Sequence, residues 1–166
     1  MKSNYTANLE NGIESLQTQG AFLTVKSGEK INTMTIGWGS VGCIWNKPIF
    51  TVMVRKSRFT HELMETSDNF TVSIPLSKGL KNALMVCGTK SGRDIDKFKS
   101  CNLTLVDSKK VDTPIIAECE LHYECKIVYK QEMNLEFLSK NILENSYKDG
   151  NYHTFYYGEI VDSYIK

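Results

Sequence analysis

Apolar and β-branched residues gather in short runs along this chain, with polar segments and turn-forming residues between them. Such runs, whether continuously apolar or alternating, are typical of β-strands. They lie at Ala21–Val25, Ile31–Ile36, Ile49–Val54, Phe70–Ile74, Leu103–Val106, Ile115–Tyr129 and Tyr152–Val161. The last two are long and rich in aromatic and β-branched residues, as strands of antiparallel barrels often are. The pattern therefore predicts a mainly β barrel.

Other segments have the spacing of short helices. Apolar residues recur at i, i+3, i+4 and i+7 in Leu80, Ala83, Leu84 and Cys87, and Gly88 follows as a C-cap. Residues Asn134–Ser146 predict a second helix, packed through Leu135, Leu138, Ile142 and Leu143. A third short helix is expected around Leu63 and Met64, with Ser57 and Thr60 as candidate N-caps. The sum is a mainly β fold (β+α) with peripheral helices.

Composition and charge narrow the class of protein. With 166 residues, we expect one domain over 1–166 that is large enough to bury a core. The net charge of +1 argues against nucleic-acid or membrane-surface binding, both of which usually need a broad basic face. No apolar run approaches a membrane span, and Met1-Lys2-Ser3-Asn4 does not open a signal peptide.

The cysteines indicate a reducing compartment. Their number is odd, no C-x-x-C pair occurs, and the histidine spacing of a zinc site is missing. We therefore expect no metal site, and reduced thiols in a cytoplasmic protein, at Cys43, Cys87, Cys101, Cys119 and Cys125.

A cluster of basic residues stands where a strand passes into a helix. In Arg55-Lys56-Ser57-Arg58-Phe59-Thr60-His61, four side chains can carry positive charge. A helix start is already electropositive, so cations there are unfavourable unless an anion completes the site. A phosphate on the free N–H groups is the simplest such anion. The alternative is a solvated basic patch.

Two glycine-rich segments match nucleotide-binding motifs, but the neighbouring sequence lacks features that these motifs require. Gly37-Trp38-Gly39-Ser40-Val41-Gly42 fits G-x-G-x-x-G, but β-forming residues and Pro48 follow where a dinucleotide fold needs a helix. We interpret these glycines as a turn. Gly88-Thr89-Lys90-Ser91 resembles the end of a P-loop but lacks the upstream glycine spacing.

Further candidate residues admit two interpretations each. In Asn32–Trp38, hydroxyls and an amide beside an aromatic residue suit a flat polar heterocycle, or else an edge strand whose threonines face water. The charged loop of Cys87–Phe98 either bonds to itself, with Arg93 and Asp94 as a surface ion pair, or reaches a ligand. His153 lies among aromatics, as a structural residue or as a site residue. No Ser-His-Asp set or carboxylate pair can be assembled, so no catalytic residue is assigned.

Taken together, these segments resemble the flavin reductase-like family of FMN-binding split barrels, of the flavoredoxin type. The resemblance covers residues 20 to 162 in the expected order, ending in His153 and Gly158-Glu159-Ile160-Val161. Where many relatives have proline after the first arginine of the basic run, this chain has Lys56. The matching segments are Asn32–Gly39, Trp45-Asn46-Lys47-Pro48, Val54–Thr60, Phe70–Pro75 and Ser91–Phe98.

The resemblance implies a six-stranded antiparallel Greek-key split barrel, paired as a homodimer with FMN at or near the dimer interface. Ser57, Arg58 and Thr60 are then expected to bind the phosphate, with Arg55 and Lys56 adding charge. His153 is expected beside the flavin or the nicotinamide. The isoalloxazine would be lined by Asn32, Thr33, Met34, Thr35 and Trp38, and covered from the side by Cys87, Ser91, Gly92, Arg93, Asp94 and Lys97.

The resemblance also implies the chemistry. We expect an NAD(P)H-dependent flavin reductase, in which a nicotinamide donor passes a hydride to the flavin without a protein acid or base. The alternatives are a flavoredoxin-like electron carrier that exchanges electrons with a partner redox protein, and an FMN-binding protein without turnover.

Overall fold

The structure is a computed structural model that describes residues 4–166. Residues 1–3, which include most of the segment judged not to open a signal peptide, lie outside the described range. Among the helices that are described, none has the length and apolar character needed to cross a membrane.

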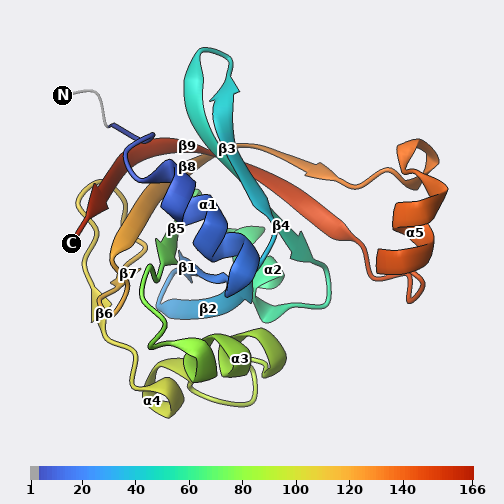
Figure 1. Cartoon of the computed structure of the whole chain (residues 1–166). Coiled ribbons are helices and arrows are strands. Elements are labelled where there is room, and N and C mark those ends of the chain that lie inside the picture. The colour runs from blue at the N-terminus through green and yellow to red at the C-terminus, as the bar shows by residue number, and fades with distance from the viewer. Residues whose placement is uncertain (1–3) are drawn as a thin grey trace.

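One large antiparallel sheet forms the body of the molecule (Figure 1). Its strand order is β2-β1-β5-β8-β9-β4-β3, and β6 and β7 form a separate two-stranded sheet. The first strands are β1 (Ala21–Ser27), β2 (Lys30–Ile36), β3 (Gly39–Ile44), β4 (Lys47–Arg55) and β5 (Asn69–Ile74). The others are β6 (Leu105–Val106), β7 (Ile115–Ile116), β8 (Leu121–Glu132) and β9 (His153–Ile165).

The sheet curls around a single apolar core. Residues of β2 such as Ile36 share this core with Val52 of β4, although four strands lie between β2 and β4 in the sheet order. Helix α1 (Leu9–Thr18) adds Leu16, and α2 (Phe59–Met64) adds Leu63 and Met64. Burial of these side chains is the main stabilising term for the closed arrangement.

A second apolar cluster lies on the outer face of the sheet. Phe22 of β1 points away from the barrel core and packs with Leu84 of α3 (Lys81–Thr89) and with Ile116 of β7. Phe98 of α4 (Lys97–Cys101) packs against the same cluster. This cluster packs α3 against β1, and α3 also contacts the neighbouring strand β2, which lines the candidate site.

The strand predictions are confirmed for the strands that line the barrel core, and they differ from the structure elsewhere. The segment Ile115–Tyr129 is two strands, β7 and β8, because Ala117–Glu120 leaves the sheet. Leu103–Val106 contributes only Leu105–Val106. The prediction of a glycine turn at 37–42 holds only in part: Gly37 and Trp38 connect β2 to β3, whereas Gly39–Ile44 is β3, an exposed edge strand. The turn of the β3–β4 hairpin lies at Trp45 and Asn46, both with positive φ.

The helix predictions need more correction. Helix α1 was not predicted, and Gly88 lies within α3 because the helix continues to Thr89. Neither Ser57 nor Thr60 caps α2, whose N-cap is Arg58. The predicted helix Asn134–Ser146 is a 3-10 turn (Leu135–Phe137) and a separate helix α5 (Lys140–Ser146), because Leu138 and Ser139 are extended.

Strands β8 and β9 run past the barrel and end in an arm that carries α5 (Figure 1). Tyr147 is the one fully buried residue between Asn134 and Gly150. Leu135, Leu138 and Leu143, expected to pack this helix, are only half-buried, and Ile142 is exposed. The arm therefore leaves apolar side chains uncovered within a single chain.

Candidate functional site

A small polar cleft lies where the end of β2 approaches β4 and the start of β9. We call it the arginine cleft. Its volume is about 130 Å³, and it is lined by Met34, Thr35, Ile36, Gly37, Trp38, Met53, Arg55, Arg58 and His153. The sheet register places Arg55 directly opposite His153. Arg58 joins them because the chain turns from β4 into α2 at this point.

Protein contacts hold both arginine side chains of the cleft. Arg58 Nη1 donates to the carbonyl of Gly88 at 2.9 Å. Arg55 donates to the carbonyls of Asn151 at 2.6 Å and Ser146 at 2.9 Å, and its guanidinium lies 5.2 Å from the centre of the Tyr147 ring. A guanidinium has five N–H donors, so these contacts leave N–H groups of each arginine available to an anionic ligand.

His153 forms the third side of the cleft and is neutral near neutral pH. Burial, followed by the positive charges of Arg55 and Arg58, lowers the pKa of His153 to about 4. Its Nδ1 lies 2.8 Å from the Tyr147 hydroxyl, and its ring lies 5.6 Å from that of Trp38. The two charges depress the imidazole pKa because the cleft is electropositive, as an anion site requires.

The rest of the basic run turns away from the cleft. Lys56 pairs with Glu132 at 2.8 Å, and Ser57 Oγ accepts from Asn151 Nδ2 at 2.7 Å. Thr60 is buried and accepts from Asn32 Nδ2 at 2.9 Å. Of the residues expected around the phosphate, the structure therefore brings together Arg55 and Arg58.

The threonines of β2 face protein. Strand β2 is an edge strand of the sheet, as one interpretation expected, but Thr33 does not face water: it is fully buried, and its hydroxyl donates to the Leu23 carbonyl at 3.2 Å. Thr35 Oγ1 donates to the Leu84 carbonyl of α3 at 2.6 Å. Thr35 still lines the cleft, where its oxygen keeps a lone pair for a ligand donor.

The loop after α3 packs onto β2 and α2. Lys97 is buried, and its ammonium donates to the carbonyls of Thr33 at 2.8 Å and Cys87 at 2.9 Å. Arg93 pairs with Glu62 of α2 at 3.0 Å, and no ion pair with Asp94 occurs in the described structure. Ser91 Oγ accepts from the Arg93 backbone at 3.1 Å.

This loop also lines a separate hollow of about 500 Å³, which contains Asn32, Gly92, Arg93, Asp94 and Lys97. Some of the predicted flavin residues are thus divided between this hollow and the arginine cleft, and others, namely Thr33, Lys56, Ser57, Thr60 and Ser91, line neither. Cys87 faces neither hollow but the second apolar cluster.

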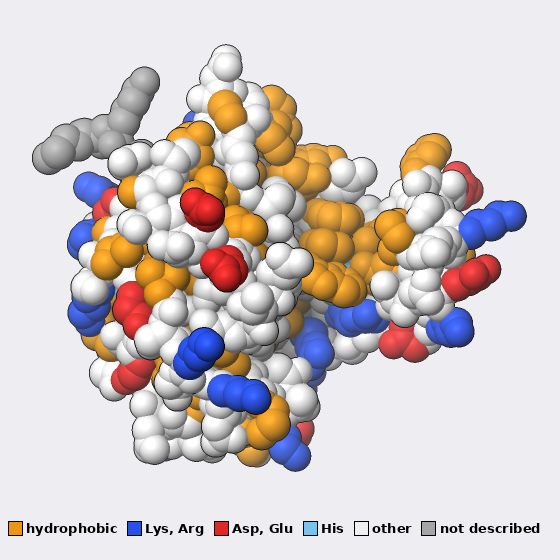
Figure 2. Space-filling view, viewed as in Figure 1, with side chains coloured by type: hydrophobic (Ala, Val, Ile, Leu, Met, Phe, Trp, Pro, Cys, Tyr) orange, Lys and Arg blue, Asp and Glu red, His pale blue; other side chains and the backbone are white. Residues whose placement is uncertain are grey.

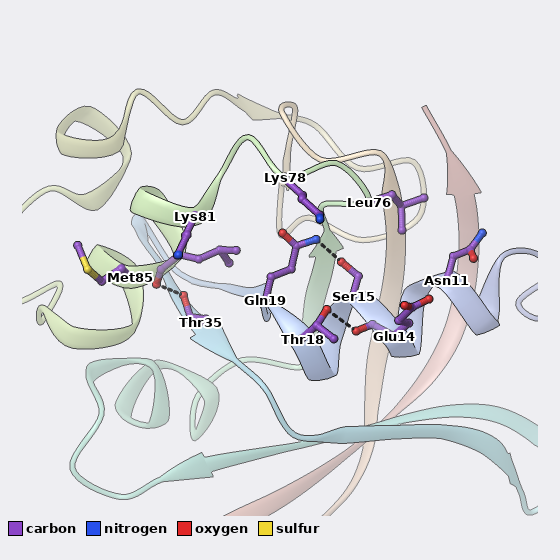
Figure 3. Close-up of a pocket in the computed structure, with 11 residues that line it drawn as sticks. Asn11, Glu14, Ser15, Thr18, Gln19, Thr35, Leu76, Lys78, Lys81 and Met85 are labelled. Carbon is purple, nitrogen blue, oxygen red and sulfur yellow. Dashed lines mark hydrogen bonds between the residues drawn. The ribbon is translucent and has the colours of Figure 1, made fainter.

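Two larger hollows adjoin the cleft. The first, the α1–α3 groove, has a volume of about 790 Å³ and shares Thr35 with the cleft. Figure 3 shows Ser15, Thr18 and Gln19 along α1 on one side, with Lys78 and Lys81 on the other. The second, the apolar recess, measures about 440 Å³ and shares Gly37, Trp38 and Met53 with the cleft. Figure 2 shows apolar side chains gathered between the body and the arm.

Sequence reasoning missed Met53, Tyr147 and Asn151. A signal for Met53 was present: side chains alternate along a strand, so Met53 shares a face with Arg55. Tyr147 and Asn151, which hold His153, Arg55 and Ser57, lie in the loop before β9, where no local pattern indicates their partners. Among residues 4–166, no group of three His, Cys, Asp or Glu side chains is placed to hold a metal.

Comparison with known proteins defines the family. The model of the flavin reductase like domain matches residues 13–166, and the chain therefore belongs to the flavin reductase-like family. An uncharacterised protein of Archaeoglobus fulgidus is 36% identical over 122 residues, 74% of this chain and 68% of that protein.

Solved structures agree with this assignment. A flavoredoxin from Methanosarcina acetivorans superposes with a TM-score of 0.70 at 28% identity, covering 89% of this chain and 68% of that one. An NADH:FAD oxidoreductase from Streptomyces globisporus C-1027 superposes with a TM-score of 0.68 at 20% identity, covering 89% and 75%. The fold is the family's mainly β antiparallel split barrel with several helices. The described sheet has seven strands, one of them the unpredicted β3.

The residues of the cleft fit one end of a flavin nucleotide. A phosphate needs fixed cationic donors, which Arg55 and Arg58 supply in the cleft. A flat ring needs apolar cover, which Trp38 and Met53 would supply where the cleft opens into the apolar recess. The cleft itself is smaller than the roughly 300 Å³ at which small-molecule sites begin. The remainder of such a ligand would extend into an adjoining hollow.

Proposed function

We propose that this chain binds FMN at the arginine cleft and acts as an NAD(P)H-dependent flavin reductase. The observation that carries the proposal is the pair of guanidinium groups, Arg55 and Arg58, beside a neutral His153 and a half-exposed Trp38. No carboxylate is among the residues that line the cleft, although Asp149 Oδ1 lies 3.5 Å from Arg55 Nη1 outside it, and two cations gathered in this way favour an anionic ligand. Membership of the flavin reductase-like family favours a flavin as that ligand.

Each element of the site then has a task. Arg55 and Arg58 bind the phosphate, and their carbonyl partners at Asn151, Ser146 and Gly88 fix the guanidinium planes. Thr35 offers its hydroxyl oxygen, and Trp38 and Met53 cover the ring. Lys97 holds the Thr33 carbonyl against α3, so it positions β2 without facing the cleft.

A bound flavin supplies the hydride chemistry. The chain's own residues bind and orient it, and the low pKa of His153 keeps that side chain from serving as an imidazolium proton donor near neutral pH. The nicotinamide donor is expected in a hollow that adjoins the cleft.

Anaerobic mixing tests this function. The purified protein is loaded with FMN and mixed with NADH or NADPH, and the flavin absorbance is followed. Loss of the visible band within seconds supports the reductase. A band that persists with both nicotinamides, and disappears only when a reduced redox protein is added, rejects it.

The second candidate is a flavoredoxin-like electron carrier. The 28% identity to the Methanosarcina flavoredoxin favours it. In this case the same cleft holds the flavin, and the partner protein takes the place of the nicotinamide donor.

We also propose that the active species is a homodimer in the cytoplasm. The uncovered apolar residues of the arm and the exposed Trp45 support self-association. The five free cysteines support a reducing compartment.

A further inference from the structure

The α1–α3 groove is a preformed hollow beside the arginine cleft. Its volume of about 790 Å³ lies within the roughly 300–1,000 Å³ that small-molecule sites occupy. The Ser15 hydroxyl of α1 donates to the Pro75 carbonyl, and Gln19 Nε2 donates to the same carbonyl at 3.0 Å. On the other side, Thr35 donates to the Leu84 carbonyl of α3 at 2.6 Å. These contacts fix both walls, so the groove does not depend on a ligand to form.

One wall of this groove is cationic. Lys78 and Lys81 are exposed along it, and in the described part of the chain neither ammonium forms an ion pair. Lys81 is the first residue of α3, and no acidic residue in the first turn of this helix offsets its charge. Figure 3 shows Lys78 reaching toward Gln19. Ammonium groups donate strong hydrogen bonds to phosphate oxygens, so this wall suits a phosphate.

The opposite wall carries the one carboxylate among the lining residues, that of Glu14 on α1. A carboxylate in a dinucleotide site accepts hydrogen bonds from ribose hydroxyls. The groove also has apolar lining that can cover a base, from Leu76, Leu84 and Met85. It therefore combines two cations, a ribose-type acceptor and apolar surface, which together match the adenosine end of a phosphorylated dinucleotide.

Helix α1 separates the groove from the apolar recess. Two faces of the helix line the two hollows: Asn11, Glu14, Ser15 and Thr18 the groove, and Ile13, Leu16 and Gln17 the recess. Both hollows reach the arginine cleft, the groove at Thr35 and the recess at Trp38. A flavin ring covered by Trp38 and a second ligand in the groove can thus meet at the cleft without sharing a hollow.

We propose that the α1–α3 groove binds the adenosine end of the nicotinamide donor and selects NADPH over NADH. This inference rests on the proposed reductase function. The two donors differ by one phosphate on the adenosine ribose, so a pair of cations is the feature that can distinguish them. Lys78 and Lys81 bind this 2′-phosphate, and the nicotinamide end leaves the groove at Thr35.

Nucleotide fragments test the groove without any turnover. The FMN-loaded protein is titrated calorimetrically with adenosine 2′,5′-bisphosphate and with 5′-AMP, which lacks the 2′-phosphate. We expect the bisphosphate to bind about tenfold more tightly, the ratio that one hydrogen bond to a charged group provides. Equal affinities, or tighter binding of 5′-AMP, would overturn the proposal.

Anaerobic reduction separates this inference from the function on which it rests. NADPH should half-saturate the rate of flavin reduction at a concentration about tenfold lower than NADH does. Equal half-saturating concentrations would reject the selection of NADPH and leave the reductase in place. No reduction by either nicotinamide would reject the reductase itself.

Substitutions of exposed lysines assign the phosphate contact. The double variant Lys78→Ala/Lys81→Ala should bind adenosine 2′,5′-bisphosphate about tenfold more weakly and change the affinity for 5′-AMP by less than about threefold. Lys90→Ala is the matched control, because Lys90 is an exposed lysine that directly follows α3 and does not line the groove. This control should bind both nucleotides as the wild type does. An equal loss in Lys90→Ala, or no loss in the double variant, would contradict the assignment.

Discussion

Arg58 is the residue on which phosphate recognition depends most simply. It lines the cleft and makes one hydrogen bond to protein, to the Gly88 carbonyl. We expect Arg58→Ala to weaken FMN about 10- to 100-fold, because a hydrogen bond to a charged group contributes about 1.5–3 kcal/mol. Riboflavin, which has no phosphate, should lose far less affinity. Fluorescence titration with both ligands measures the difference.

Lys56 provides the matched control for this substitution. It is a cation of the same basic run, but it is exposed and pairs with Glu132. Lys56→Ala should change FMN affinity by less than about fivefold, as expected for an exposed ion pair. If Arg58→Ala lowered the affinities for FMN and for riboflavin equally, Arg58 would not be a phosphate-binding residue.

His122 makes the stability of the fold depend on pH. Burial lowers its pKa from 6.5 to about 4, and its Nε2 has no hydrogen-bond partner within residues 4–166. Below pH 6.5 the His122 imidazole becomes protonated in the unfolded chain, whereas in the folded chain it becomes protonated only near pH 4. The free energy of unfolding should therefore fall by up to about 3 kcal/mol as the pH drops through this window.

Urea unfolding at several pH values measures this slope. His122→Asn, which has no titrating group, should reduce the dependence between pH 6.5 and 4 by about half, because His153, whose pKa is also lowered to about 4, contributes a similar share. A slope unchanged from the wild type would show that other groups cause it.

At the scale of elements, the contact between the loop 91–96 and β2 depends on Gly92. A Cβ at this position would collide with Asn32 Oδ1 and approach the Phe59 ring to 3.1 Å. Asn32 cannot move aside freely, because its amide is bonded to the buried Thr60. Gly92→Ala should therefore lower the free energy of unfolding by about 1–3 kcal/mol.

Gly42 of β3 serves as the control for Gly92, since an added Cβ there meets nothing within 4 Å. Gly42→Ala should change stability by no more than about 1 kcal/mol. Thermal unfolding of both variants measures the two losses of stability. Equal losses in Gly92→Ala and Gly42→Ala would argue against a tight contact between the loop and β2.

The elements that sequence predicted well are those whose own side chains fill the core. In β5, every residue is buried and the run Phe70–Ile74 is apolar or small, so local pattern and tertiary packing agree. Strand β3 is exposed along most of its length, and its pairing with β4 leaves no apolar pattern to recognise. Helix α1 buries Leu16 but few other large side chains, so its apolar stripe is short.

The site was predictable to the extent that charge clusters are visible in sequence. Arg55 and Arg58 were found because four cations near a helix start conflict with its dipole. The burial of Lys97 was not predictable, since a lysine in a charged loop is typical of a solvated surface. Its ammonium donates to the main-chain carbonyls of Thr33 and Cys87. Every residue has such a carbonyl, so the side chains in the sequence do not indicate these partners.

At the scale of the whole molecule, the arm and the β3–β4 hairpin present apolar surface that the single chain leaves open. Phe137 is 86% exposed and Trp45 is 57% exposed beside Tyr129 and Tyr157. We expect a dimer of twice the 18.9 kDa chain mass in light scattering. Phe137→Glu or Trp45→Glu should shift it toward monomer, because each places a charge in an apolar interface.

Met85→Glu is the control for these surface changes, since Met85 is 58% exposed in the α1–α3 groove, away from the arm. This variant should remain dimeric. A wild-type protein that runs as a monomer at micromolar concentration would contradict the proposed assembly.

Two larger hollows adjoin the arginine cleft and determine where the rest of a bound flavin can lie. The arginine cleft meets the α1–α3 groove at Thr35 and the apolar recess at Trp38, so a flavin anchored by its phosphate has two directions in which to extend. A crystal structure of the FMN complex would show which side chains hold the phosphate. We predict phosphate oxygens within hydrogen-bond distance of Arg55 or Arg58. A phosphate held instead by Lys78 and Lys81, with the cleft filled by solvent, would contradict it.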